Sequence, residues 1–414
     1  MLRKKSLTLP LMAALVTLTV RLLTYMLKEH LSLPYHFGIT TPNTGAETWK
    51  EAVFWKHQFG VVPDYLVAVV PWYVEYIPLL PSAVNVSILC VCDAVTVFLV
   101  SQWPSAVPQL VFTLFVLNPA MVLLPALESL APLEHLILTV IIECCRRRRS
   151  QGWLIYVARI LAPVLGLYFI ALTVALWFPV GTSSSRSALV GVLLSELIVG
   201  GFGLFYLVSW GSVSARTSLY SPPDNGVMWY VRLLIIPVFG QCMEIFQLQL
   251  PAFVTLLVAV ALPSKVPAKT LAYANSVPGD RRLLVVLFAV CVSKLCRCHL
   301  ALPDYSLGVF FIYSLLDTTG RNGKGGKEES RQSMFDCIRS ANVFVPVYTL
   351  LLVVPLQYSF YTGWVMWDTA NPNWVFFPQV AFVVVGAIFM LTFLRKAFGV
   401  INAETVAGDK PKQS

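Results

Sequence analysis

Charged residues are scarce in this sequence of 414 residues. Asp, Glu, Lys and Arg make up 12% of it, whereas they make up about a quarter of an ordinary soluble domain. Hydrophobic residues account for 57%, and the mean hydropathy is +0.72. There is also no polar stretch long enough to fold as a separate domain. We therefore expect a single transmembrane domain over residues 1–414, with lipid as its main solvent.

Sequence motifs for catalysis are absent as well. We find no Gly-rich phosphate-binding loop, no nucleophile elbow and no two-histidine zinc motif. Most of the nine cysteines lie within apolar runs, where small buried hydrophobes or acylated cysteines are more typical than metal ligands. We predict no catalytic residue, no metal site and no cofactor.

What the sequence does contain is a series of apolar segments between residues 7 and 394. Their number and length predict an all-α polytopic bundle of about twelve spans, some of them half-length or re-entrant. Two stretches are interrupted. Arg159 and Pro163 divide 153–178 into two half-length helices in a hairpin, and 227–262 is expected to form a re-entrant piece followed by a full span. The remaining spans are expected near 7–27, 83–101, 108–126, 131–143, 188–208, 283–300, 303–317, 341–358 and 374–394.

The net charge of +9 follows from an uneven distribution of basic residues. With these spans, most of the 30 Lys and Arg residues fall on one side, in loops such as 146–149 and 321–339 and near both ends of the chain. The positive-inside rule places that side, and both termini, in the cytosol. Membrane lipid and topology account for the charge, and no nucleic acid is required as a partner.

Two extramembrane loops are long. The loop 318–340 is rich in Gly and Lys and is expected to be a flexible cytosolic segment. The loop 28–82 lies on the opposite, lumenal side, and its segment 47–55 is predicted to form an amphipathic helix on the membrane surface. This arrangement is similar to the architecture of membrane-embedded GT-C sugar transferases, which use paired acids in such a loop. The acids of this loop are not paired in sequence, so the chemistry of those enzymes is missing: Glu29, Glu47, Glu51, Asp64 and Glu75.

A few charged residues interrupt the spans. Glu134 and His135 stand together at the entry of a short span, where a proton relay or a satisfied pair at a helix end are both possible, and the second is favoured. Arg232 is expected to pair with Glu244 within the membrane.

Several short motifs resemble one family in the same order along the chain. The sequence contains the loop elements Trp49-Lys50-Glu51-Ala52-Val53 and Gly60-Val61-Val62-Pro63-Asp64-Tyr65, the helix Leu114-Phe115-Val116-Leu117-Asn118-Pro119, and a loop from Ser209-Trp210 to Trp229-Tyr230. These elements are similar to elements of the phosphatidylinositol-glycan class U (PIG-U) family. Ala370-Asn371-Pro372-Asn373-Trp374 and Phe393-Leu394-Arg395-Lys396 resemble two further elements of that family near its C-terminus.

The resemblance implies a non-catalytic subunit of the GPI transamidase complex in the endoplasmic reticulum membrane. Such a subunit helps bind the GPI lipid or the C-terminal attachment signal of proproteins. Its expected partners are the other transamidase subunits, including the caspase-like cysteine protease subunit that performs the chemistry. The alternative is a polyprenol-phosphate-dependent mannosyltransferase of the endoplasmic reticulum. A transporter or scaffold is a third possibility, although no inverted repeat is present to indicate a transporter.

A lipid- or glycan-binding role requires polar and aromatic side chains at the lumenal rim of the membrane domain. Asparagine can bind a headgroup without the cost of burying a charge, and tryptophan packs against acyl chains. The candidate binding residues are Asn371, Asn373, Trp374, Asp224, Asn225, Trp229, Tyr230 and Asn118. Asn-Pro pairs and tryptophan belts also occur in membrane proteins for purely structural reasons.

Overall fold

The computed structural model describes residues 8–28, 44–60, 80–103, 111–147, 153–165, 169–177, 249–261 and 281–296, together with scattered residues within 303–307 and 359–388. All regular structure in these ranges is helical, as expected for an all-α protein. The helices are α1 (Thr8–Met26), α2 (Ala46–Phe59), α4 (Ser82–Ser101), the π-helix η1 (Phe112–Val116), α6 (Pro119–Ala126), α7 (Ala131–Arg147), α8 (Leu154–Val164), α9 (Ile170–Trp177), α12 (Leu250–Ala261) and α13 (Arg281–Leu295).

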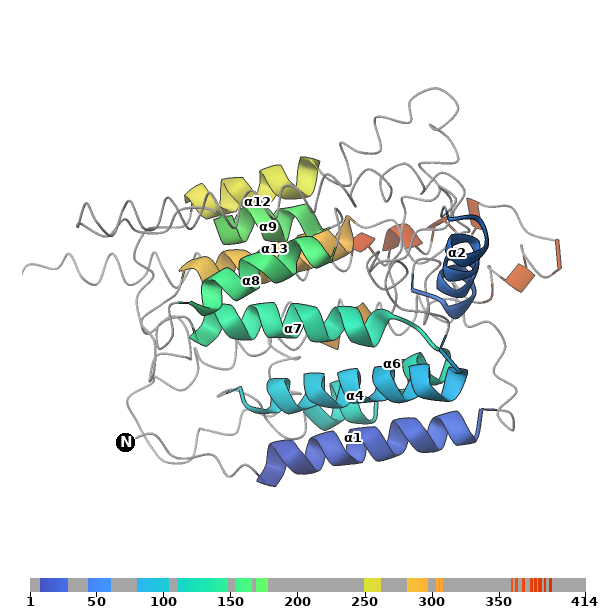
Figure 1. The fold of residues 1–414 in the computed structure, drawn as a ribbon. Helices are drawn as coiled ribbons and strands as arrows, with labels where there is room; N and C mark the ends of the chain where they lie inside the picture. The colour runs from blue at the N-terminus through green and yellow to red at the C-terminus, as the bar shows by residue number, and fades with distance from the viewer. Residues whose placement is uncertain are drawn as a thin grey trace, which may run out of the picture.

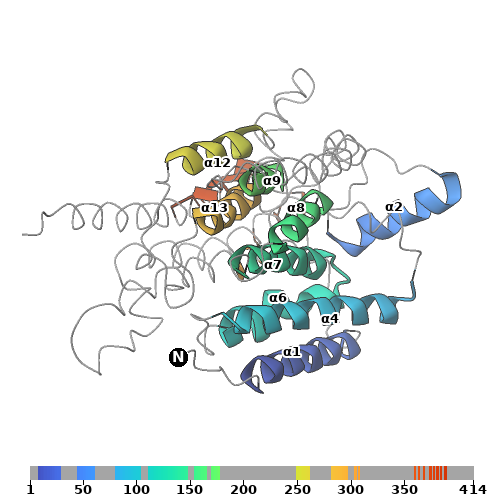
Figure 2. The same cartoon turned by 60° about the vertical axis from the view of Figure 1, so that its left-hand side comes forward.

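The main helices form a stack with roughly aligned axes (Figure 1). The stack begins with α1, passes through α4 and α7, and ends with α13, α9 and α12, and the turned view gives the same order (Figure 2). Neighbours in this stack pack directly: α1 on α4, α4 on α7, and α7 on both α8 and α13. Helix α2 lies apart from the stack at one end of it.

Two described helices are long and apolar enough to cross a membrane, namely α1 and α4. Their bounds agree with the predicted segments 7–27 and 83–101. A third crossing is counted if α6 and α7, which are bent by 116° relative to each other, form one broken span. The structure thus supports a membrane-associated helical protein, and the twelve-span arrangement stays a prediction.

The predicted continuous span 108–126 is broken in the structure. The π-helix η1 ends at Val116, and α6 begins only at Pro119. Proline has no backbone N–H, so the helical hydrogen bond that it would donate to the carbonyl four residues earlier cannot form. Hydropathy averages over such a break, which explains why it was not predicted. The next helix, α7, continues to Arg147 and is longer than the predicted segment 131–143.

The prediction of two short helices within 153–178 is confirmed by α8 and α9. With 11 and 8 residues they are roughly 16 and 12 Å long. Neither can cross a hydrocarbon core of about 30 Å alone. Arg159 joins them, since its Nε donates to the carbonyl of Leu176 at 3.1 Å. The predicted spans 188–208 and 341–358 and the loop 318–340 lie outside the described residues, as does most of 227–262 apart from α12.

Candidate functional site

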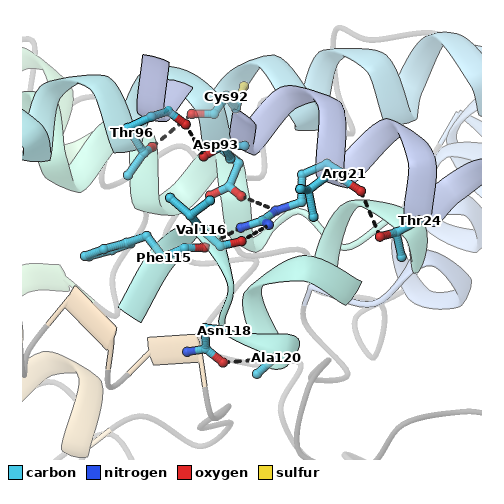
Figure 3. Close-up of polar contacts among 12 residues, drawn as sticks. Arg21, Thr24, Cys92, Asp93, Thr96, Phe115, Val116, Asn118 and Ala120 are labelled. Atoms are coloured by element: carbon cyan, nitrogen blue, oxygen red, sulfur yellow. Dashed lines mark hydrogen bonds and ion pairs between the residues drawn. The ribbon is translucent and has the colours of Figure 1, made fainter. Parts of the chain in front are cut away.

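The broken span is held together by Arg21 of α1. This side chain is fully buried, and its Nε donates to Oδ2 of Asp93 on α4 at 2.7 Å. Its two terminal nitrogens donate to the carbonyls of Val116 and Phe115 at 2.8 and 2.5 Å. Figure 3 shows the guanidinium between the Asp93 carboxylate and these two carbonyls.

The need for Arg21 follows from the local sequence. In a continuous helix, the carbonyls of Phe115 and Val116 would accept from the N–H groups of residues 119 and 120. Pro119 has no N–H, and the N–H of Ala120 donates to the side chain of Asn118 instead. Arg21 therefore supplies the two donors that the break removes, and Asp93 balances its charge.

Asn118, one of the predicted binding residues, is the N-cap of α6. Its Oδ1 accepts from the N–H of Ala120 at 3.1 Å, as seen in Figure 3. Its Nδ2 donates to the carbonyl of Leu114 at 3.2 Å and to Oγ of Ser306 at 3.1 Å. Both N–H bonds of this amide are thus made within the protein, and Asn118 links the broken span to residues near 306.

A second polar site, which we call the Glu128 junction, consists of Glu128, Lys28, Trp49, Lys50 and Ser82. Glu128 lies in the bend between α6 and α7, has a positive φ of 52° and is 4% exposed. Its Oε1 accepts from Oγ of Ser82 at 2.6 Å, and its Oε2 lies 2.7 Å from Nζ of Lys50. Nζ of Lys28 is 3.9 Å from Oε1. The junction therefore brings the ends of α1, α2 and α4 to the α6–α7 bend.

The charge of Glu128 is set by these neighbours. Burial raises the pKa of this carboxyl, but the contacts with Lys50 and Ser82 outweigh burial, and the net pKa lies below the ordinary value of 4.5. Glu128 is therefore ionised at neutral pH and attracts both lysines.

Helix α2 packs on this junction through one face. Trp49, Ala52 and Val53 are buried, and their spacing places them on a single stripe of the helix. Phe54 and Phe59 are exposed, at 48% and 62%. The structure has a helix at the predicted segment 47–55 of the loop 28–82, while its amphipathic character and its position relative to a membrane surface stay predictions.

The end of the stack opposite the Glu128 junction is basic. Arg146 and Arg147 at the end of α7 both bind Glu143, and Nη2 of Arg147 donates to Oε1 of Gln102 at 2.8 Å. Because α4 begins at Ser82 beside Glu128 and ends beside Arg147, α4 and α7 run in the same direction.

A buried polar cluster joins α7 to α13. Lys294 of α13 forms ion pairs with Glu134 of α7 and with Asp304. Nε2 of His135 lies 3.4 Å from Oδ1 of Asp304. All four side chains are at most 8% exposed. The sequence predicted a satisfied pair at Glu134 and His135, and the structure adds Lys294 and Asp304 as their partners.

The other predicted binding residues are described only in part. Asn373 and Trp374 have helical backbone and exposed side chains, and Trp374 is 58% exposed. Trp367, close in sequence, is 68% exposed. The remaining candidates, namely Asn371, Asp224, Asn225, Trp229 and Tyr230, lie outside the described residues, as do Arg232 and Glu244.

Sequence reasoning missed Asp93, Glu128 and Asp304 as partners of basic residues. A signal was present, because an ionisable side chain within an apolar segment requires a partner of opposite charge or a polar backbone group. Arg21 and Lys294 each imply such a partner. The sequence does not say which of the available carboxylates it is.

No protein-family model matches this chain, and no curated protein gives a significant match. The resemblance to the PIG-U family consequently depends on its short sequence motifs alone.

Proposed function

We propose that this chain is a non-catalytic membrane subunit of the GPI transamidase complex. It has about twelve spans, with both termini in the cytosol, and belongs to the endoplasmic reticulum membrane. Its role is to help bind the GPI lipid or the C-terminal attachment signal of proproteins while a caspase-like protease subunit performs the exchange.

The observation that carries the proposal is that two of the motifs shared with that family act on the same helix, α6. Asn118 of the Leu114–Pro119 motif starts the helix as its N-cap. Trp49 and Lys50 of the loop motif bind Glu128, which lies two residues beyond the end of the helix at Ala126. Motifs that lie apart in sequence thus contribute to one structural unit, which supports the proposed common architecture.

The exposed aromatic residues near the C-terminal motif support a lipid-facing role. Trp367, Trp374 and Phe377 are between 58% and 75% exposed, although large aromatic residues are usually buried in a folded chain. Asn373, next to Trp374, has an amide that can bind a phosphate or sugar hydroxyl. Tryptophans at such positions pack against acyl chains and apolar peptide segments.

The sugar-transferase alternative makes a different demand on the lumenal loop. It requires at least two loop carboxylates in one cavity that holds a cation. Glu51, the loop acid whose side chain is described, is exposed and accepts from Nε1 of Trp55 at 3.4 Å. Nothing in the described part of the chain favours the alternative over the binding subunit.

Affinity purification of the tagged full-length chain in mild detergent, followed by mass spectrometry, tests the proposal directly. We expect a caspase-like protease subunit and further transamidase subunits to co-purify. Recovery of the chain alone, or with enzymes of dolichol-linked sugar synthesis, would overturn the proposal and make the loop carboxylates the next targets.

A second experiment tests the predicted binding rim. In cells that depend on this chain, Asn373→Ala and Trp374→Ala should reduce the surface level of a GPI-anchored reporter and leave the co-purifying subunits unchanged. His57→Gln is the control, because this exposed side chain on α2 lies outside both the rim and the Trp49–Val53 motif. If both rim variants support normal reporter levels, these two residues do not bind the lipid or the signal.

A further inference from the structure

Three buried polar atoms on α4 and α7 have no hydrogen-bond partner within the described part of the chain. They are Oδ1 of Asp93 on α4, Nδ1 of His135 on α7 and Oγ1 of Thr139, one turn further along α7. All three side chains are 0% exposed. Leaving a buried polar atom without a hydrogen bond is unfavourable, and internal water molecules commonly bind such atoms in folded proteins.

The three residues lie at about the same level of the helix stack. Helices α4 and α7 pack on each other, and Gln102 at the end of α4 bonds to Arg147 at the end of α7. Counting back equally far from these two residues leads to Asp93 on α4 and to a point between His135 and Thr139 on α7. The imidazole of His135 also interacts electrostatically with the Asp93 carboxylate. His135 and Thr139, at positions i and i+4, are neighbours on one face of α7.

The hydroxyl of Thr139 is not used by its own helix. Two other buried threonines donate to the carbonyl four residues earlier: Thr17 to Ala13 at 2.8 Å and Thr96 to Cys92 at 2.9 Å. Thr139 makes no such bond. Its hydroxyl is therefore turned toward a different partner.

The hydrogen-bonding roles of the other two atoms follow from their neighbours. Nε2 of His135 is 3.4 Å from Oδ1 of Asp304. Because a carboxylate only accepts, this contact places the N–H of a neutral imidazole on Nε2 and leaves Nδ1 as an acceptor. Arg21 binds Oδ2 of Asp93, so Oδ1 is the second acceptor. The three atoms thus comprise two acceptors and one hydroxyl that can donate.

We propose that one internal water molecule is bound between α4 and α7. It donates one hydrogen bond to Oδ1 of Asp93 and one to Nδ1 of His135, and it accepts one from the hydroxyl of Thr139. Three hydrogen bonds are typical of a buried water. The water connects the Arg21–Asp93 pair to the polar cluster around Lys294, and this site is independent of any role in GPI attachment.

Water fits this site better than an ion does. Arg21 already compensates the charge of Asp93, so a metal cation would add a positive charge beside a buried guanidinium. An anion would be repelled by the carboxylate of Asp93. A neutral molecule with two donors and one acceptor satisfies the three atoms without adding charge.

Nitrogen-15 solid-state NMR on the full-length chain in lipid, with labelled histidine, tests the site. The chain has five histidines, and subtraction of the His135→Gln spectrum isolates the signal of His135. We expect one protonated and one bare ring nitrogen, with transfer of magnetisation from water protons to the bare nitrogen. A bare nitrogen that receives no magnetisation from water, or a ring protonated at both nitrogens, would overturn the proposal.

Removal of one hydroxyl makes the test sharper. Thr139→Val keeps the branched shape of the side chain, and we expect it to reduce the transfer from water to His135 at least severalfold. Thr139→Ser retains the hydroxyl and should preserve the transfer. Thr17→Val is the matched control, because that buried hydroxyl bonds within α1. Transfer that is unchanged in Thr139→Val would show that Thr139 does not hold the water, and the proposed site would be wrong.

Discussion

Trp49 and Glu128 are joined by a hydrogen bond from the indole N–H to the backbone carbonyl, 3.0 Å long and spanning 79 residues of sequence. The next residue, Lys50, binds the carboxylate of the same Glu128. Two consecutive residues of α2 therefore hold both the backbone and the side chain of one residue in the α6–α7 bend. The bend has a positive φ at Glu128, a strained conformation for a residue with a side chain, so these contacts help to fix it.

The hydrogen bond of Trp49 can be removed with little loss of apolar contact. Trp49→Phe keeps an aromatic ring in the buried site and leaves the carbonyl of Glu128 without this donor. We expect a loss of about 1 kcal/mol in the free energy that holds α2 in place. Limited proteolysis of the loop 28–82 in detergent should become faster. Trp55→Phe is the control, because the N–H of Trp55 bonds within α2 to an exposed partner; equal rates for the two variants would contradict the role given to Trp49.

The ion pairs of Glu128 predict a dependence of stability on pH. The pKa of Glu128 is lower in the folded protein than its ordinary value of 4.5, so its contribution to stability is present above that ordinary value. The contribution is lost as the pH falls through the lower folded pKa. Glu128→Gln should reduce the thermal stability at pH 7 and narrow its difference from the wild type at pH 3 to 4. A difference that is constant with pH would show that Glu128 is not stabilised as an anion.

Arg21 and Asp93 should show strong coupling in a double-mutant cycle. Either single substitution, Arg21→Met or Asp93→Leu, leaves an unpaired buried charge and is expected to cost about 3 to 5 kcal/mol. The double variant leaves no such charge and should be less destabilised than the two single effects added together. Its remaining loss reflects the carbonyls of Phe115 and Val116. Thermal aggregation followed by size-exclusion chromatography measures the stability of each variant. If the loss in the double variant equals the sum of the two single losses, Arg21 and Asp93 do not form a stabilising pair.

Asn118 has two separable sets of contacts, namely the hydrogen bonds with Leu114 and Ala120 in its own segment and the hydrogen bond with Ser306. Asn118→Ala removes both and is expected to cost about 1 to 2 kcal/mol, because an N-cap is lost. Ser306→Ala removes only the hydrogen bond between Asn118 and Ser306. We expect this substitution to lower the free energy of unfolding by about 1 kcal/mol or less. The difference in thermal stability between the two variants measures the cap. If Ser306→Ala is as damaging as Asn118→Ala, the cap contributes nothing.

The sequence was sufficient to predict helices α1 and α4 and the presence of two short helices within 153–178, but not the break in 108–126. Apolar segments end where charged or breaking residues accumulate, which placed α1 and α4 within a few residues of their observed ends. The two short helices within 153–178 were expected from Arg159 and Pro163, together with the cytosolic placement of Arg186, although Arg159 and Pro163 both lie within α8. In each case the signal is local, since it depends on residues within or beside the segment itself.

The connections between helices were not predictable in the same way. Arg21 has several carboxylates along the chain as possible partners, and only the packing of α1 on α4 selects Asp93. Glu128 lies in a short turn, and the sequence of this turn does not indicate that Trp49, Lys50 and Lys28 are its partners. The predicted binding rim, of which the structure describes Asn373, Trp374 and Asn118, depends even more on such long-range placement.

The contacts of Arg21 also constrain the order in which parts of the chain can pack during synthesis. Its counter-ion is synthesised 72 residues later, and the carbonyls that it binds are 94 and 95 residues later. At ordinary translation rates, α1 waits roughly 4 to 14 s before Asp93 has even been made. The first helix therefore cannot settle into lipid by itself with its arginine satisfied. The buried contacts of Arg21 can be complete only after the chain has been synthesised as far as Val116.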